Sequence, residues 1–339
     1  MKTVHVSKAA GLVLGQDLTR IVPGEFKGVA FPKGHIIQPE DIPVMLNMGK
    51  DHVYIMELGP EDVHENLAAQ QLSTLSAGSN IIRDHAREGK VQMRSGILGL
   101  LAIQTDKLLQ INEMPGVALS TLHSGTLVKE NEIVAAAKVI PLSLPRNTLH
   151  QIERLCAGEK IISIRPIPAR KAGLVITGNE VFYGRIQDKF EAVIQKKISD
   201  LGSELTTTIF LPDDATKISK AIQQLSYEND LVFVTGGMSV DPDDVTPAAV
   251  RRTGADIVVY GAPVMPGAMF LLAYLNHTPV LGIPACGMFS KITILDVLLP
   301  KILAGDEITH RFIASLGHGG LCRTCKEECH YPNCSFCNY

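Results

Sequence analysis

The second half of the chain alternates short apolar runs with stretches whose apolar residues recur at helical spacing. The runs "AGLVIT", "ELTTTIFL", "LVFVTGG", "ADIVVYG" and "PVLGIP" are typical of strands, and "DKFEAVIQKKISDLG" and "ATKISKAIQQLSYEND" of amphipathic helices. Two more helices are expected, one opened by "DVTPAAVRR" and one running from about Phe289. Strands that alternate with helices predict an α/β fold, a mostly parallel sheet covered by helices on both faces.

The first half has shorter apolar runs separated by turn residues. Residues 1–60 are expected to form a small β-rich unit with one short helix, "EDIPVMLNMG". The next part opens with a helical stretch, "EDVHENLAAQQLS", continues as alternating runs and closes on a proline-rich linker, "IRPIPARKAG". We therefore expect a β-rich N-terminal unit (1–60), a mixed, β-rich middle domain (61–168), an α/β domain (169–310) and a cysteine-rich tail (311–339).

Composition narrows the class of protein. A chain of 339 residues is too long for one ordinary core, and 45% hydrophobic residues are enough to fill several. A net charge of −3 argues against nucleic-acid binding, which usually requires a basic surplus. We find no apolar run long enough for a signal peptide or a membrane span, so no membrane association and a cytoplasmic location are expected.

The stretch "VFVTGGMSVDPDDVTPAAV" lies where a buried strand gives way to a helix. In parallel sheets, ligands bind outside the carboxyl ends of the strands. Gly236 and Gly237 allow a tight turn and close approach of the backbone to a ligand. Thr246 is expected as the N-cap and Pro247 as the first helical residue, leaving helix N–H groups to favour an anion such as phosphate.

The same loop carries three acids, Asp241, Asp243 and Asp244. Carboxylates beside a phosphate site are suited to hold Mg²⁺, which binds carboxylate and phosphate oxygens together. The alternative is that the acids only cap the helix and favour its dipole. The residues alone leave both alternatives open.

Three segments, in order, carry a family resemblance. "TGGMSVDPDDVTPAA" resembles the signature of the molybdopterin-binding domain shared by molybdenum-cofactor biosynthesis proteins of the MoeA and Mog/MoaB type. "VITGNEVFYGRIQD" is similar to the first loop of that family, and "APVMPGAMFLLAYLNHTPVLGIP" to the MoeA-type stretch with a Pro-Gly turn before a strand. The resemblance covers roughly residues 170–305, about two-fifths of the chain.

The resemblance implies a site for a tricyclic pterin with its dithiolene and phosphate and, in adenylylating members, for ATP with Mg²⁺. It implies that Asp244 and Asp188 are catalytic residues that hold Mg²⁺ against the phosphate. The positions expected to bind the cofactor are Gly178, Glu180, Thr235, Gly236, Gly237, Ser239, Asp244, Thr246, Pro247, Pro266, Gly267, Gly282 and Pro284.

The chain also departs from the family pattern. Asn179 stands where MoeA-type proteins usually have Asp, and Phe190 where Asn or Ser is expected. "PACG" replaces Pro-Gly-Asn-Pro, which places Cys286 at the substrate-facing turn. That cysteine is either a reactive thiol with a pKa lowered at a helix start or a small buried hydrophobe. Residues 1–168 lack the Asn-Ser-Ala-Met-Asp-Gly-Tyr segment of MoeA-type proteins.

The tail crowds five of the seven cysteines into two C-x₂-C pairs and one cysteine between them. Such spacing is typical of structural zinc, and closely spaced thiolates also suit an iron–sulfur cluster. Disulfides are not expected without an export signal. We also expect the tail to be dispensable for pterin binding. The expected metal ligands are Cys322, Cys325, Cys329, Cys334 and Cys337.

The function expected from the resemblance is molybdate insertion into molybdopterin or adenylylated molybdopterin, a transferase reaction. The alternatives are molybdopterin adenylylation, a non-catalytic carrier or sensor of the cofactor, and a nucleotide-using enzyme on the same fold. The expected partners are molybdopterin, molybdate, Mg²⁺, a molybdoenzyme or another cofactor-biosynthesis protein, and further copies of the chain in a homo-oligomer.

Overall fold

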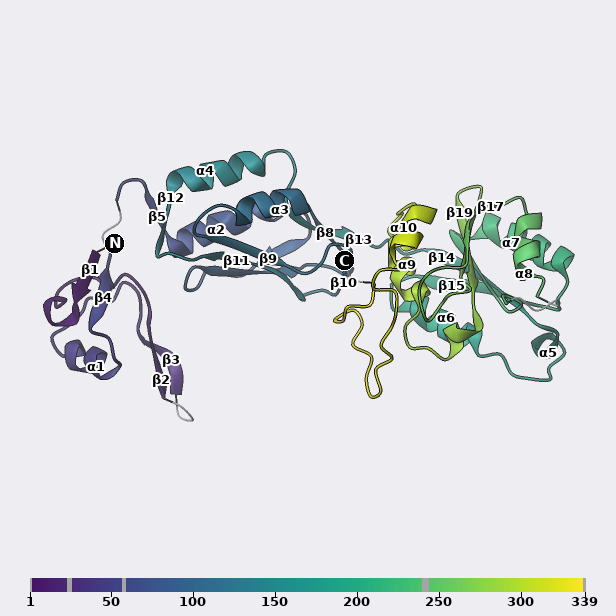
Figure 1. Ribbon diagram of the computed structural model, residues 1–339, viewed down its shortest axis with the longest axis horizontal. Coiled ribbons are helices and arrows are strands. Elements are labelled where there is room, and N and C mark those ends of the chain that lie inside the picture. The colour runs from purple at the N-terminus through teal and green to yellow at the C-terminus, as the bar shows by residue number, and fades with distance from the viewer. Residues whose placement is uncertain (1, 23–25, 57–58, 240–243, 338–339) are drawn as a thin grey trace. The chain divides into compact units, whose positions relative to one another are not determined.

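The computed structural model describes residues 2–22, 26–56, 59–239 and 244–337. It divides the chain into two compact units (Figure 1). The first comprises Met1–Ile97, Leu101–Leu122 and Lys129–Ile164, and the second Leu98–Leu100, His123–Val128 and Arg165–Tyr339. The second unit contains the strand-end motifs.

The first 56 residues pack around a small core of their own. Strands β1 (Lys2–His5) and β4 (His52–Ile55) pair antiparallel, as do β2 (Leu18–Val22) and β3 (Phe26–Phe31). A 3₁₀ turn, η1 (Val6–Lys8), and helix α1 (Asp41–Asn47) complete this part. The structure confirms the short helix predicted here, which buries Met45 against Leu14 and Ile37.

The rest of the first unit is built on a four-stranded antiparallel sheet in the order β6-β7-β11-β9. Its elements are β5 (Asp62–His64), α2 (Glu65–Ser76), β6 (Ile81–Arg83), β7 (Lys90–Ser95), α3 (Thr105–Asn112), β9 (Val117–Thr121), β11 (Ile133–Val139), β12 (Ser143–Pro145) and α4 (Arg146–Leu155). The stretch predicted to be wholly helical begins instead with β5. Its helix starts at Glu65 because the His64 ring accepts the Asn66 N–H as a cap.

Two helices of this part were not predicted. In α4 only Leu149 and Ile152 are buried. A single pair of apolar residues three positions apart is too short a pattern to predict a helix. In α3 only Ile111 is buried. The predicted linker is also partly wrong, because β13 (Ile162–Pro166) occupies its beginning and β14 (Lys171–Thr177) its last three residues. Strands β8 (Gly99–Ile103) and β10 (Leu127–Val128) pair antiparallel within the second unit, at Gly99–Val128 and Leu100–Leu127.

The second unit has one six-stranded sheet in the order β15-β14-β16-β19-β18-β17. Its strands are β14 (Lys171–Thr177), β15 (Glu204–Leu211), β16 (Leu231–Thr235), β17 (Asp256–Tyr260), β18 (Leu271–Leu275) and β19 (Thr278–Ile283). Strands β14, β15, β16 and β19 pair parallel with one another. Strand β18 pairs antiparallel with both β19 and β17, so of the strands described in this sheet β18 alone runs against the other five. The mostly parallel sheet predicted from the apolar runs is confirmed.

Helices cover both faces of this sheet, as predicted (Figure 1). Along β16, Leu231 and Phe233 belong to the core under α6 (Phe190–Ser199) and α9 (Ile294–Leu303). Val232 and Val234 belong to the core under α7 (Ala215–Glu228) and α8 (Thr246–Arg252). Because successive side chains of a strand point to opposite faces, β16 is buried on both sides.

The final helices begin later than predicted. After β19 the chain forms a 3₁₀ turn, η2 (Ala285–Met288), and α9 starts only at Ile294 rather than near Phe289. Thr293 and Asp296 form a capping box that fixes this start. The Thr293 side chain accepts backbone N–H groups of the first helical turn, and the Asp296 side chain accepts the Thr293 backbone N–H. Helices α5 (Asn179–Phe182) and α10 (His310–Ser315) complete the unit.

The cysteine-rich tail is part of the core of the second unit, which overturns the expectation that it is separable. Phe336 is only 3% exposed and belongs to the core that contains α9. The Cys322 N–H donates to the Met265 carbonyl (2.9 Å), and the Met265 N–H donates to the Gly320 carbonyl (2.8 Å). Removing residues 318–339 would therefore expose core and release the backbone around Met265.

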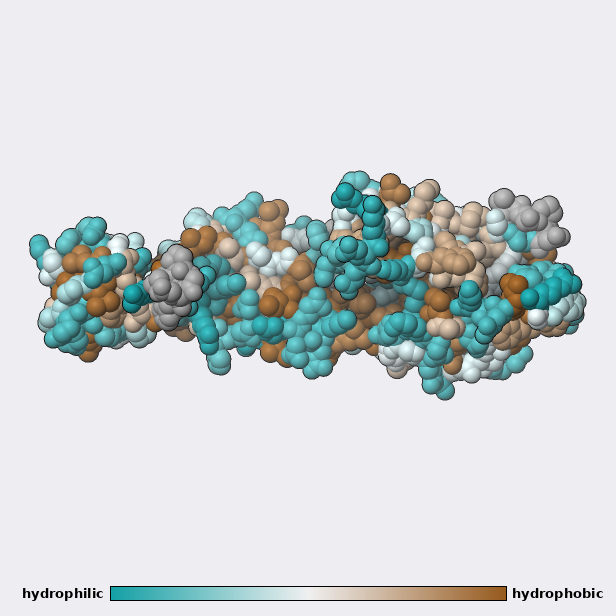
Figure 2. All heavy atoms as spheres, turned by 90° about the horizontal axis from the view of Figure 1, so that it is seen from below, coloured by the Kyte–Doolittle hydropathy of each residue, from teal (hydrophilic) through white to brown (hydrophobic). Residues whose placement is uncertain are grey.

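The surface and the helices bear on membrane association. On the face drawn in Figure 2, hydrophilic and hydrophobic residues are intermingled. None of the helices in the described part of the chain is long and apolar enough to cross a bilayer.

Candidate functional site

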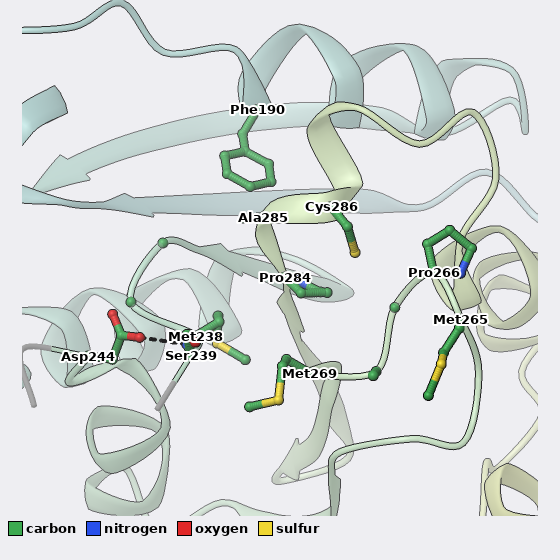
Figure 3. Close-up of a pocket in the computed structure, with 14 residues that line it drawn as sticks. Phe190, Met238, Ser239, Asp244, Met265, Pro266, Met269, Pro284, Ala285 and Cys286 are labelled. Atoms are coloured by element: carbon green, nitrogen blue, oxygen red, sulfur yellow. Dashed lines mark hydrogen bonds between the residues drawn. The ribbon is translucent and has the colours of Figure 1, made fainter. Parts of the chain in front are cut away.

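A pocket of about 480 Å³ lies at the carboxyl ends of β16 and β19 (Figure 3). Three segments line it: the loop after β16, the turn before β18 and the turn after β19. Phe190, at the start of α6, closes one side. The lining residues are Phe190, Gly236, Gly237, Met238, Ser239, Asp244, Met265, Pro266, Gly267, Ala268, Met269, Pro284, Ala285 and Cys286.

The glycine turn after β16 is set by its protein neighbours. Gly236 and Gly237 have φ angles of +86° and +53°, in the region that L side chains rarely adopt. A Cβ at Gly236 would lie 2.2 Å from the Thr177 carbonyl oxygen. The Thr246 hydroxyl donates to the Gly236 carbonyl (2.8 Å). The glycine at 236 is thus required by the neighbouring strand end, and the turn it makes forms one wall of the pocket.

Asp244 closes the loop that follows this turn. Its Oδ2 accepts the Ser239 N–H at 2.7 Å (Figure 3). The Tyr260 hydroxyl donates to the carbonyls of Met238 and Ser239 (3.0 and 3.2 Å). Burial raises the pKa of Tyr260, and the nearby charge of Asp244 raises it further. Among the described residues, Asp244 is the one charged residue that lines the pocket.

The predicted cap of α8 is wrong. Thr246 is the first helical residue and is fully buried, and the N-cap position is Val245, which makes no side-chain capping bond. Thr246 and Pro247 do not line the pocket, so the helix start does not face it as predicted. Asp244 bonds within its loop instead of capping the helix. Asp241 and Asp243 lie outside the described residues.

Asp188 has a different partner from the one expected. Its two carboxylate oxygens accept the N–H groups of Phe190 (3.0 Å) and Glu191 (2.9 Å), the first residues of α6. This is the geometry of a capping carboxylate, which satisfies two otherwise unpaired helix donors. Asp188 is not among the lining residues of the pocket.

The predicted cofactor positions divide into two groups. Those that line the pocket are Gly236, Gly237, Ser239, Asp244, Pro266, Gly267 and Pro284. Those that do not are Gly178, Glu180, Thr235, Thr246, Pro247 and Gly282. Gly282 has a packing reason to lack a side chain, because its Cβ would lie 2.6 Å from the Met238 methyl carbon. Gly178 and Glu180 stand beside Asn179, which exchanges hydrogen bonds with Asp213.

Sequence reasoning placed Cys286 at this site but missed the three methionines of the pocket lining. Met238, Met265, Met269 and Cys286 all line the pocket, and each lies within or beside a motif segment (Figure 3). Burial raises the pKa of the Cys286 thiol, an effect partly offset by backbone N–H groups of Cys286 and Gly267. The direction of this pKa shift favours the alternative of a small hydrophobe over that of a reactive thiol.

The tail brings some of its cysteines close together. Burial and the neighbouring Cys322 and Cys334 raise the pKa of the Cys337 thiol to about 11. None of the seven cysteines forms a disulfide. Across the described residues, no three His, Cys, Asp or Glu side chains are close enough together to hold a metal ion. Cys322 and Cys334 thus lie near Cys337 but do not form a metal-ligand set with it, and the expected metal stays a prediction.

The fold and the pocket define an α/β domain that receives its ligand at the carboxyl ends of parallel strands. Residues 173–304 match the family described as "Probable molybdopterin binding domain", and this domain of the chain belongs to that family, as its three motifs predicted. Residues 3–57 match a separate family, a domain of unknown function (DUF8806).

Relatives of known name differ in how much of this chain they resemble. The molybdopterin molybdenumtransferase of Haemophilus influenzae is 23% identical over 287 residues, which cover 79% of this chain and 68% of the relative. A CinA-like protein of Mycobacterium sp. (strain MCS) is 36% identical over 83 residues, 24% of this chain and 20% of the relative. The crystal structure of a molybdopterin biosynthesis MoeA protein from Pyrococcus horikosii aligns with a TM-score of 0.34 and 13% identity, covering 89% of this chain and 74% of that one.

Proposed function

We propose that the chain binds molybdopterin in the strand-end pocket and inserts molybdate into it, or into its adenylylated form, during molybdenum-cofactor assembly. The observation that carries the proposal is the pocket itself. Two of the three motif segments, together with Phe190 after the first, line one cavity within the domain that matches the family. The distant match to a molybdopterin molybdenumtransferase, which extends over 79% of the chain, supports the reaction.

The lining suits a flat, sulfur-bearing heterocycle. Phe190 and the three methionines offer polarisable surface, and thioethers make favourable contacts with aromatic rings. The glycine turn leaves the backbone of Gly236 and Gly237 open to the ligand on the pocket side. The protonated Cys286 thiol is a weak hydrogen-bond donor at the opposite wall.

The donor set at Asp244 fits Mg²⁺ held between protein and substrate. Mg²⁺ is commonly bound by one or two carboxylates together with substrate phosphates, and Asp244 supplies one carboxylate to the pocket. When bound, the ion would neutralise charge that develops on the phosphate or adenylate. The Ser239 N–H holds one oxygen of Asp244 in place and thereby orients the carboxylate. Asp188, which we also proposed as a ligand, would have to give up its bonds to α6.

A non-catalytic carrier or sensor of the cofactor is the second candidate. It is favoured by the position of Asp188 outside the pocket and by the single charged residue among the described residues of the lining. We further propose a cytoplasmic location, a homo-oligomeric assembly, and transfer of the product to a molybdoenzyme or another cofactor-biosynthesis protein.

Turnover separates these candidates. The purified chain, supplied with molybdopterin, MgATP and molybdate, is expected to yield pterin that retains molybdenum after the protein is denatured, measured by elemental analysis of the extracted cofactor. The same assay with adenylylated molybdopterin tests the activated substrate. Adenylylated pterin without molybdenum would identify an adenylyltransferase, and recovery of unchanged pterin from both substrates would leave only the carrier.

We also propose that the tail holds zinc or an iron–sulfur cluster through Cys322, Cys325, Cys334 and Cys337, with Cys329 as a fifth thiol. Metal binding would have to draw the pairs together, as coupling of metal binding to folding allows. Protein purified without oxygen is expected to contain roughly one zinc or one cluster per chain. The variant Cys337→Ser should lose it, while Cys156→Ser, at a buried site in the first unit, should keep it. Metal-free protein with stoichiometric disulfides would refute this proposal.

A further inference from the structure

A second cavity, of about 200 Å³, lies in the second unit and shares no lining residue with the strand-end pocket. It combines a loop from residues 124–127, two helices and the cysteine-rich tail. The lining residues are Ser124, Gly125, Thr126, Leu127, Val297, Lys301, Phe312, Leu316, Tyr331, Pro332 and Cys337. We call it the Lys301 cavity.

Among the described residues that line this cavity, Lys301 carries the only charged group, its ammonium. Among the described residues it forms no hydrogen bond and no ion pair. It makes a cation–π contact with the Phe312 ring, whose centre lies 5.7 Å from the Lys301 Nζ. Burial lowers the pKa of Lys301, Asp306 raises it and Arg165 lowers it. Asp306 is itself paired with Arg165 at 2.5 Å. A half-buried cation without its own counter-charge is costly, and a bound anion would remove that cost.

The loop across the cavity is shaped to let backbone reach this ammonium. Gly125 has a φ of +83°, and a Cβ there would lie 2.6 Å from the Lys301 Nζ. A side chain at position 125 would therefore displace the amine. The Gly125 N–H has no hydrogen-bond partner among the residues that the structure describes. It is available as a donor close to the positive charge.

Tyr331 supplies a further donor. Its hydroxyl makes no hydrogen bond within the described part of the chain, although its ring packs edge-on against Phe336 at 6.2 Å. A phenol is protonated at neutral pH and its O–H is a hydrogen-bond donor. A cation and two hydrogen-bond donors that have no partner among the described residues thus belong to residues that line the same cavity.

We propose that the Lys301 cavity binds a tetrahedral oxyanion, with Lys301 as its counter-charge and the Tyr331 hydroxyl and the Gly125 N–H as hydrogen-bond donors. Phosphate, sulfate and molybdate all have this chemistry. Each is a tetrahedral ion of five heavy atoms that can carry two negative charges. Molybdate is the anion that the proposed insertion reaction consumes, and phosphate and sulfate are general cellular anions. The inference stands on the cavity and does not depend on pterin binding.

The position on α9 places this site near the pocket but apart from it. Ile294, at the start of α9, packs against Gly267 of the pocket. A Cβ added at Gly267 would lie only 2.7 Å from the Ile294 side chain. Lys301 follows Ile294 by seven residues, about 10 Å along the helix. An oxyanion held here would sit one helix length from the pterin site, a suitable place for a store or an entry position.

Equilibrium dialysis of the pterin-free full chain against molybdate, sulfate and phosphate tests the site. One saturable equivalent of oxyanion per chain is expected. Lys301→Met keeps the aliphatic stem and should weaken binding at least about tenfold, the effect of losing a charge-assisted bond. Tyr331→Phe removes only the hydroxyl and should weaken it severalfold. Lys220→Met, on the exposed side of α7, is the matched control and should bind like the unaltered chain.

The order of affinities identifies the source of the anion. Tighter binding of molybdate assigns the site to the metal oxyanion, and equal or tighter binding of phosphate or sulfate assigns it to a general cellular anion. Absence of saturable binding for all three anions, or equal binding by Lys301→Met, would overturn the inference. If Lys301→Met does not fold by circular dichroism, unchanged binding by Tyr331→Phe overturns it instead. Oxyanion binding by a chain that fails to bind molybdopterin would contradict only the proposed function.

Discussion

The variant Asp244→Asn is expected to lower the rate of molybdate insertion by on the order of 100-fold or more, the usual effect of removing a key electrostatic partner of a transition state. The amide keeps an oxygen that accepts the Ser239 N–H, so the loop remains closed. Only the charge that would hold Mg²⁺ is lost. The melting temperature and the affinity for molybdopterin without Mg²⁺ should barely change.

Steady-state turnover, measured across a magnesium titration and beside a thermal melt, checks this expectation. The matched control is Asp200→Asn, which removes a carboxylate at the exposed end of α6, where it pairs with Lys196 at 3.0 Å. The control should retain full activity. A variant of Asp244 that stays fully active but loses about 0.5–2 kcal/mol of stability would show that the carboxylate only holds its loop closed.

The second large effect concerns the glycine turn. We expect Gly236→Ala to lower the free energy of unfolding by roughly 3 kcal/mol or more, because it adds a steric clash to an unfavourable backbone conformation. The new Cβ would lie 2.2 Å from the Thr177 carbonyl oxygen, at a φ of +86°. Neither strand end can move away easily, since β14 and β16 are paired in the centre of the sheet.

Gly254 provides a control with the same backbone and no clash. Its φ is +85°, and nothing lies within 4 Å of the position its Cβ would take. Gly254→Ala should therefore cost only the conformational term, about 1–2 kcal/mol. Urea denaturation of both variants gives the difference. Equal losses at the two positions would mean that contact with the Thr177 carbonyl does not decide the identity of residue 236.

The parallel part of the sheet was predictable because continuous apolar runs mark strands that are buried on both faces. The antiparallel strand β18 was not, although its residues are equally apolar. It forms a hairpin with β19, and the turn residues Asn276 and His277 have φ angles of +49° and +74°. Such a turn usually contains a glycine, and its absence here removed the sequence signal for the hairpin. Phe336 gave no signal either, because its place in the core depends on a contact far along the chain.

The location of the pocket was predictable, and the roles of its residues were less so. The glycines and the Pro-Gly turn predict where the backbone bends at strand ends. The structure confirms these bends at Gly236 and Gly267, which both have positive φ angles and line the pocket. Asp188 carried the same motif signal but caps α6, since hydrogen-bond partners depend on local geometry that spacing does not encode. The methionines carry no pattern of their own, because they are common in cores as well as in binding sites.

A fluorescence titration with molybdopterin tests the central claim, that this pocket is the pterin site. The chain has no tryptophan, and Ala285 is an exposed residue of the pocket wall, so Ala285→Trp both obstructs the pocket and adds a single reporter. Ala157→Trp places the same reporter at an exposed site in the first unit. We predict that the Ala157 variant binds one equivalent of molybdopterin, as the unaltered chain does by the pterin's own fluorescence, and that the Ala285 variant binds at least about tenfold more weakly. Equal affinity in both variants would place the pterin elsewhere and contradict the account.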